Sequence, residues 1–203
     1  MLSVKEVFYS IQGEGHHAGR PSVFCRFSGC NLWSGVPSRK ASSLCWFCDT
    51  DFVGGTKYTE DELFDAIVEL IPEGSLPLIV FTGGEPALQL TGTLIDRLKR
   101  IGLSVAIETN GTKELPLAGP YWVTMSPKTL DDLVVRKGHE LKLLFPLEGV
   151  SPKDVEGFDF DYFSLQPIFD SNYKENLSRA ITYCLQHPKW RLSTQQHKVW
   201  GLR

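Results

Sequence analysis

The spacing of three cysteines constrains this chain more than any other feature. Cys30, Cys45 and Cys48 follow the pattern C-x14-C-x2-C. Two thiolates separated by two residues can reach one metal centre, because a tight turn brings their sulfur atoms to the same side. The third thiolate arrives from the far end of a loop. Three thiolates can bind three irons of a four-iron cluster and leave the fourth iron open for another ligand.

A structural zinc ion is the alternative, and it normally has four protein ligands. Cys25 is the candidate for the fourth. It lies in the segment 22–27, where strand alternation puts Val23, Cys25 and Phe27 on one face. A free cysteine among apolar neighbours usually behaves as a small core residue. The cysteines alone therefore leave both an iron–sulfur cluster and a zinc site open.

Charge and hydropathy exclude several classes of protein. The 203 residues carry a formal net charge of −3, which gives no electrostatic reason to expect nucleic acid as a partner. No apolar run is long enough to span a bilayer, and residues 1–5 lack the apolar stretch of a signal peptide. We therefore expect a cytoplasmic protein with no membrane partner, whose paired thiols are metal ligands or redox groups rather than disulfides. Its length suits a single domain, 1–203, with an inserted cluster-binding loop at about 30–50.

Short apolar runs alternate with helical patterns along the chain. A capping-box pattern at 59–62 predicts a helix start, a second helix is expected to end at Gly102, and a last one to span about 172–187. Alternating strands and helices favour a parallel sheet. With few convincing helices, we predict an α/β fold: a modified, incomplete (βα) barrel of about six parallel strands. The expected strands cover residues 3–9, 21–28, 78–81, 104–107, 122–125, 141–145 and 162–165.

Polar residues follow one predicted strand after another, at the point where each strand ends. They are Thr82, Glu108, Ser126 and Gln166. Folds of the α/β barrel type place their active sites at this edge of the sheet. The sequence therefore predicts that these side chains lie at the active site.

The strand at 78–81 leads into Gly83-Gly84-Glu85-Pro86. Exposed backbone carbonyls and one carboxylate can accept hydrogen bonds from an ammonium group without side-chain crowding. This strand end, downstream of the three cysteines, resembles the radical S-adenosylmethionine (SAM) superfamily. In that superfamily the open iron of a [4Fe-4S] cluster binds the amino and carboxyl groups of the methionine part of SAM. The resemblance favours a cluster over zinc.

The first cysteine gap has fourteen residues, where the superfamily usually has three. This departure points to one branch, the 7-carboxy-7-deazaguanine synthase family, some of whose members have the long gap. The chain resembles that family from residue 12 to 203. The motifs that carry the resemblance are Gln12-Gly13-Glu14-Gly15, Phe24-Cys25-Arg26-Phe27, Cys30-Asn31-Leu32, Cys48-Asp49-Thr50, Thr82-Gly83-Gly84-Glu85-Pro86, Glu108-Thr109-Asn110-Gly111, Ser126-Pro127-Lys128 and His197-Lys198.

The resemblance implies a homodimeric radical SAM lyase. Family members convert 6-carboxy-5,6,7,8-tetrahydropterin to 7-carboxy-7-deazaguanine with loss of ammonia, on the way to queuosine and related deazapurines. A reductant such as flavodoxin supplies an electron to the cluster, SAM yields a 5′-deoxyadenosyl radical, and this radical takes a hydrogen atom from the pterin. The expected cofactors are therefore the [4Fe-4S] cluster, SAM and Mg2+.

The resemblance also assigns roles to residues. Cys30, Cys45 and Cys48 are expected to bind the cluster, and Thr50 to bind Mg2+, since a hard cation prefers oxygen ligands. Residues expected to contact SAM are Phe47, Cys48, Asp49, Gly84, Glu85, Glu108, Ser126, Pro127, Lys128, Gln166, Pro167, Ile168 and Phe169. Residues expected to bind the pterin are Ile11, Gln12, Gly13, Glu14, Arg26, Thr82, His197 and Arg203, the last through its terminal carboxylate.

Simpler interpretations compete with some of these roles. Arg26 can be a solvated charge on a strand, Thr50 a turn residue, and Ser126 and Gln166 partners for backbone groups at strand ends. Another small radical SAM enzyme, such as a glycyl-radical activase that acts on a protein, is the nearest rival function. A non-enzymatic zinc module with Cys25 as fourth ligand is the rival from a different class.

Overall fold

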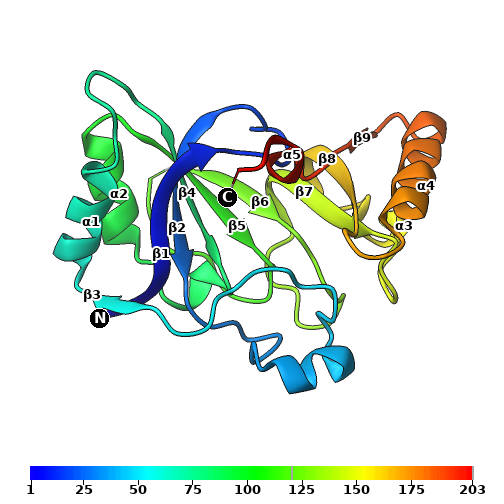
Figure 1. The fold of residues 1–203 in the computed structure, drawn as a ribbon. Helices are drawn as coiled ribbons and strands as arrows, with labels where there is room; N and C mark the ends of the chain where they lie inside the picture. Colours follow the sequence, from blue (N-terminus) through cyan, green and yellow to red (C-terminus); the bar gives the residue numbers. More distant parts are fainter. Residues whose placement is uncertain (120, 203) are drawn as a thin grey trace.

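The computed structural model describes residues 1–119 and 121–202, which form one nine-stranded sheet in the order β3-β1-β2-β4-β5-β6-β7-β8-β9 (Figure 1). From β2 to β9 all neighbours are parallel, while β1 is antiparallel to both β2 and β3. The strands are β1 (Leu2–Ile11), β2 (Pro21–Phe27), β3 (Thr56–Tyr58), β4 (Leu78–Gly83), β5 (Ser104–Thr109), β6 (Trp122–Met125), β7 (Lys137–Phe145), β8 (Asp159–Pro167) and β9 (Trp190–Leu192).

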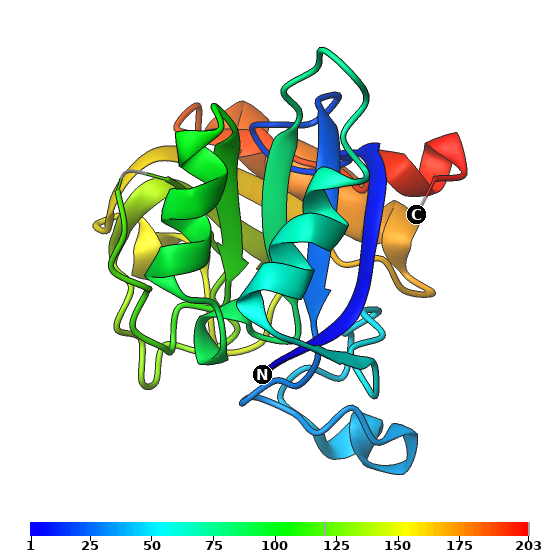
Figure 2. The same ribbon diagram turned by 90° about the vertical axis from the view of Figure 1, so that its left-hand side faces the viewer.

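The helices cover the sheet unevenly. Figure 2 shows α1 and α2 side by side on one face, and α4 packs against β8 and β9 at the far end. The helices are α1 (Glu60–Val68), α2 (Gly92–Arg100), α3 (Pro152–Val155), α4 (Tyr173–Gln186) and α5 (Gln196–Trp200), with 3-10 turns η1 (Pro37–Ser42) and η2 (Pro86–Leu88).

The predicted fold class is confirmed, since the parallel strands curve without closing into a barrel. β3 and β9 remain as the two edges of the sheet in the described part of the chain. The parallel run includes β9, which the sequence did not predict because three residues are too short for a periodic pattern. The capping box is present as expected: Thr59 Oγ1 accepts from the Glu62 N–H at 3.2 Å, and a Glu62 oxygen accepts from the Thr59 N–H at 2.7 Å.

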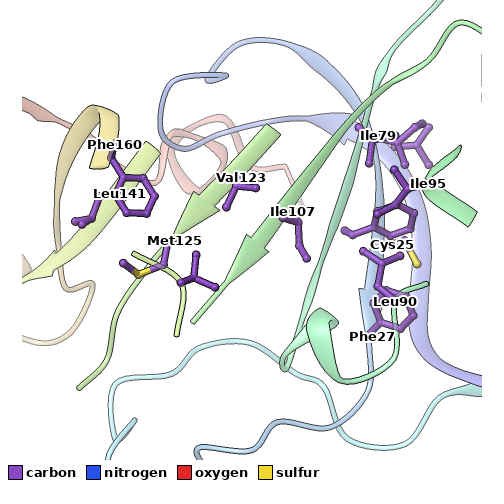
Figure 3. Close-up of a cluster of buried hydrophobic side chains, with 14 of the residues drawn as sticks. Cys25, Phe27, Ile79, Leu90, Ile95, Ile107, Val123, Met125, Leu141 and Phe160 are labelled. Atoms are coloured by element: carbon purple, nitrogen blue, oxygen red, sulfur yellow. The ribbon is translucent and has the colours of Figure 1, made fainter. Parts of the chain in front are cut away.

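The two faces of the sheet differ in polarity because side chains alternate along each strand. The face under α1 and α2 is apolar, and Figure 3 shows Cys25 there beside Phe27 and Leu90. Cys25 is fully buried in this core, as predicted, so the proposed zinc quartet is not formed. The opposite, concave face carries polar side chains on successive strands: Arg26, Thr82, Glu108, Thr124, Lys142 and Gln166.

Candidate active site

The three spaced cysteines line one pocket at the carboxyl edge of the parallel strands, which we call the cysteine pocket. Cys30, Cys45 and Cys48 are all free thiols on its wall. The Cys48 N–H donates to the Cys45 carbonyl at 2.9 Å, which is the tight turn that the two-residue spacing predicts. The Leu32 N–H points at Cys30 Sγ, 3.5 Å away. η1 lies in the exposed excursion between the first two cysteines.

The donor set of the cysteine pocket fits an iron–sulfur cluster. Burial raises the pKa of Cys30, and it raises that of Cys45 to about 11 against the opposing charge of Lys128. The negative charges of neighbouring cysteines add to both shifts. Three thiolates on one pocket wall are the number of protein ligands that a four-iron cluster with one open iron needs.

The glycine-rich strand end packs directly against the start of the cysteine loop. The Gly84 N–H donates to the Phe27 carbonyl at 3.1 Å, and the Glu85 N–H donates to the Gly29 carbonyl at 2.9 Å. A Cβ on Gly84 would lie 1.8 Å from the Gly29 oxygen. Gly83 has φ of 125°, a conformation that favours glycine. The glycines thus permit close approach of two backbones, in addition to the open pocket wall that the sequence suggested.

Glu85 does not reach the pocket wall with its side chain. It is fully buried, and its carboxylate accepts hydrogen bonds from the Thr109 hydroxyl at 2.8 Å and from the Asn110 N–H at 2.7 Å. Burial raises its pKa, while these donors oppose the shift. Pro127 also lies outside the wall. The structure brings the other residues predicted for SAM together around the cysteine pocket: Phe47, Cys48, Asp49, Gly84, Glu108, Ser126, Lys128, Gln166, Pro167, Ile168 and Phe169.

A second pocket adjoins the first, and we call it the loop pocket because residues 11–14 form one wall. The residues predicted to bind the pterin line it: Ile11, Gln12, Gly13, Glu14, Arg26, Thr82 and His197. Arg203, predicted for the same role, lies outside the described residues. Thr50 lines both pockets, and so do Glu14, Asp49, Thr82, Glu108, Lys142 and Gln195.

Charged groups meet at the boundary between the two pockets. Lys142 Nζ lies 2.7 Å from Glu14 Oε2 and 3.0 Å from Glu108 Oε2. Burial works to raise the pKa of Glu14, but the charge and hydrogen bond of Lys142, with bonds from Gln195 and Gln166, lower it to about 2. For Glu108, burial outweighs the effect of Lys142 and raises the pKa to about 7. Glu14 is therefore a carboxylate at neutral pH.

The last helix closes the loop pocket by docking on the loop after β1. The Gln196 N–H donates to the Gly13 carbonyl at 2.9 Å, and Gln195 Nε2 donates to Glu14 Oε1 at 3.0 Å. Lys198 Nζ lies 2.5 Å from Asp49 Oδ2 in the cysteine loop. A Cβ on Gly13 would lie 2.5 Å from His197 Nδ1, so glycine is required for this contact.

Sequence reasoning missed several residues of the pocket walls, chiefly Lys142, Gln195 and Trp33. Lys142 had a detectable signal: it stands at an inward position of an apolar strand, where an unpaired lysine is almost never found. Gln195 had no signal, since it lies in a short connection between β9 and α5. Arg26, which could have been a solvated charge, instead lines the loop pocket and pairs with Glu6 at 2.9 Å.

The open parallel sheet with three cysteines at its carboxyl edge defines a radical SAM protein, and the Radical SAM superfamily model matches residues 36–143. Curated relatives named 7-carboxy-7-deazaguanine synthase align over nearly the whole chain. One from Bradyrhizobium diazoefficiens is 49% identical and covers 99% of both chains. One from Bacteroides thetaiotaomicron is 40% identical over 100% of both. The chain belongs to the 7-carboxy-7-deazaguanine synthase family, which confirms the family that the motifs predicted.

A solved structure supports the same assignment. The crystal structure of QueE from Escherichia coli superposes with a TM-score of 0.70 at 25% sequence identity, covering 96% of this chain and 93% of that one. The superfamily implies the [4Fe-4S] cluster and SAM as cofactors, as predicted. None of the helices in the described part of the chain has the length and apolar character needed to cross a membrane.

Proposed function

We propose that this protein is a radical SAM lyase that converts 6-carboxy-5,6,7,8-tetrahydropterin to 7-carboxy-7-deazaguanine, with loss of ammonia, in queuosine biosynthesis. The observation that carries the proposal is the pair of adjoining pockets. One is lined by the three cysteines, the other by the polar loop after β1, and they share Glu14, Thr82 and Glu108. A cofactor in the first pocket would therefore directly face a substrate in the second.

In the cysteine pocket, Cys30, Cys45 and Cys48 would bind the cluster, and Gly84 and Asp49 would lie beside SAM. When bound, these cofactors supply a radical that abstracts hydrogen from the substrate. The protein's part is to orient the ligands and exclude water. The half-buried Ser126 and Lys128 form one side of this wall, with Lys128 Nζ donating to Ser126 Oγ at 2.6 Å.

In the loop pocket, Glu14 would accept hydrogen bonds from the amino and ring N–H groups of the pterin. Its two oxygens have lone pairs to spare beyond the bonds from Lys142 and Gln195. Arg26 would face the pterin carboxylate, since its Nε is paired with Glu6 and a guanidinium has further donors. Gln12, Thr82 and His197 complete the wall.

Thr50 is the proposed Mg2+ ligand. It lies on both pocket walls, where a hydroxyl-bound cation could also meet a carboxylate of the substrate. Asp49, next to it, forms an ion pair with Lys198 of α5.

The partners of the enzyme follow from the family resemblance. We propose a cytoplasmic homodimer that receives its electron from a reductant such as flavodoxin. Gel filtration tests the homodimer, since a monomer at micromolar concentration would reject it. Turnover with purified flavodoxin in place of a chemical reductant tests the proposed electron donor.

One assay tests the proposed reaction. Anaerobically reconstituted protein is incubated with SAM, reductant, Mg2+ and 6-carboxy-5,6,7,8-tetrahydropterin, and the products are identified by mass. The expected product is 7-carboxy-7-deazaguanine, formed with release of ammonia. Cleavage of SAM without consumption of the pterin would reject the substrate while leaving the radical SAM class intact.

A further inference from the structure

A single buried lysine connects the two pockets. Lys142 rises from β7 on the concave face, and its side chain is only 7% exposed. Its Nζ contacts Glu14, from the loop after β1, and Glu108, from the end of β5. Each of these carboxylates is 18% exposed. Glu108 lines both pockets, as does Glu14, so one ammonium group joins a residue proposed for SAM to a residue proposed for the pterin.

The charges around this lysine are unbalanced. The carboxylates facing it are Glu14, Glu108 and, from its own strand, Glu140, which is 1% exposed and accepts from the His16 N–H at 3.0 Å. The ammonium of Lys128 and the imidazole of His197 from α5 also interact electrostatically with Lys142. Burial acts to lower the pKa of Lys142, but the three carboxylates raise it well above its usual range. The ammonium therefore stays charged, and it is the cation that compensates the two carboxylates it touches.

We propose that Lys142 is a positioning residue that keeps Glu14 ionised and oriented as a hydrogen-bond acceptor for the substrate. This inference rests on the proposed function, because it concerns the affinity of the loop pocket for a pterin. A carboxylate accepts from the adjacent N–H groups of a pterin, whereas a protonated carboxyl presents an O–H donor to them.

Removal of the ammonium changes the protonation of the site. Glu14 and Glu108 both touch Nζ, so without it two carboxylates face each other in a buried place. Glu108, whose pKa is already raised to about 7, is the first to take up a proton. For Glu14, burial is then opposed only by the hydrogen bonds from Gln195 and Gln166. The pKa of Glu14 then rises into the physiological range, and affinity for the pterin falls as the pH decreases through it.

The test compares Lys142→Met, which keeps the apolar stem, with Lys142→Arg, which keeps the charge. Lys137→Met is the matched control, because Lys137 stands at the exposed start of the same strand. The equilibrium Kd for the pterin is measured anaerobically with saturating SAM between pH 6 and pH 9, without reductant. The free pterin itself gains and loses protons over this pH range, and this affects the Kd of every variant equally. The readout is therefore the ratio of variant Kd to wild-type Kd.

For Lys142→Met this ratio should be about tenfold larger at pH 6 than at pH 9, the change expected for one pH-linked proton over a range of at least one unit. Lys142→Arg should flatten the profile again, and Lys137→Met should have a ratio near one throughout. A ratio for Lys142→Met that does not vary with pH would overturn the inference, since a purely structural role predicts a uniform loss.

A second measurement needs no substrate and so separates this inference from the proposed function. Side-chain carboxyl resonances of 13C-labelled glutamate, with Glu14 assigned through Glu14→Gln, report its titration directly. Glu14 should titrate near pH 2 in the wild type and near pH 7 in Lys142→Met, or in Lys142→Gln if the first variant does not fold. An unchanged titration would reject the role of Lys142. A wild-type protein that binds no pterin would instead reject the substrate.

Discussion

Glu85 Oε2 accepts a hydrogen bond of 2.7 Å from the Asn110 N–H, which ties the end of β4 to the residue after β5. The Asn110 side chain continues the connection by donating to Asn31 Oδ1 at 3.1 Å, and Asn31 directly follows Cys30, which we propose as a cluster ligand. A buried carboxylate behind the pocket thus supports the loop that presents the first cysteine.

Glu85→Gln should therefore destabilise the protein even without cofactors. An amide accepts through its one oxygen only, so the NH2 group faces either the Asn110 N–H or both Thr109 Oγ1 and the Ala87 N–H, at a cost of about 1–3 kcal/mol. Urea unfolding of the cofactor-free protein measures this, with the exposed Glu148→Gln as control. Wild-type stability of Glu85→Gln, with loss of SAM binding alone, would show direct contact with SAM instead.

Replacement of any one of Cys30, Cys45 and Cys48 by Ala should abolish cluster binding and SAM cleavage. Cys25→Ala should retain about four irons per chain, because Cys25 is in the apolar core on the other face of the sheet. It should unfold more easily, since a buried sulfur is lost. Iron and sulfide analysis after anaerobic reconstitution decides the matter. Equal metal loss from Cys25→Ala and Cys45→Ala would contradict the assignment.

Thr50→Ala should weaken the response of turnover to Mg2+ without loss of iron or of SAM affinity. The hydroxyl lies on both pocket walls, and its removal takes one oxygen ligand from the cation. Turnover is titrated with Mg2+ for the wild type, Thr50→Ala and Thr50→Ser, where the serine variant should recover most of the response. An identical titration of all three would exclude Thr50 from the site.

The ionisation of Glu108 predicts a pH-dependent effect on stability. Its folded-state pKa is raised to about 7, so its stabilising contribution is fully present below about pH 4.5 and is lost as the pH rises through 7. Glu108→Gln should thus match the protonated wild type near pH 5. At pH 8 it should gain up to about 3 kcal/mol relative to the wild type.

Urea unfolding at several pH values measures this difference. The exposed Glu114→Gln serves as the control and should show no such trend. A stability difference for Glu108→Gln that is the same at pH 5 and pH 8 would mean that Glu108 is not the titrating group.

A tag at the carboxyl end should impair the loop pocket, whereas one at the amino end should not. His197 lies on the wall of the loop pocket, and we propose that the terminal carboxylate of Arg203 binds the pterin N–H groups. Moving that charge away should raise KM by about tenfold, the equivalent of one charge-assisted hydrogen bond. Steady-state kinetics of the two hexahistidine-tagged forms make the comparison. Equal KM values would reject this role.

The sequence predicted the arrangement of the site well where residues belong to strand ends. Thr82, Glu108, Ser126 and Gln166 line the cysteine pocket because the carboxyl ends of parallel strands meet at one edge. Cys25 and the start of α1 followed from alternation and capping, which are local properties of the chain.

The remaining features depend on contacts between distant segments. Glu85 is buried with hydrogen bonds to Asn110 and Thr109, and no spacing in the sequence indicates these partners. The antiparallel β1 and the short β9 likewise take their places through pairing with β2 and β8. Lys142 was predicted only as part of an apolar strand, since its partners lie 128 and 34 residues away.

The wall shared by the loop after β1 and the last helix joins opposite ends of the chain through a few hydrogen bonds, among them Gln196 N–H to the Gly13 carbonyl and Gly15 N–H to Ser193 Oγ at 2.9 Å. A wall held by so few hydrogen bonds opens at a lower free energy than the sheet. Prolonged storage or mild denaturation of the protein should accordingly produce molecules in which the cysteine pocket is still intact but the pterin no longer binds.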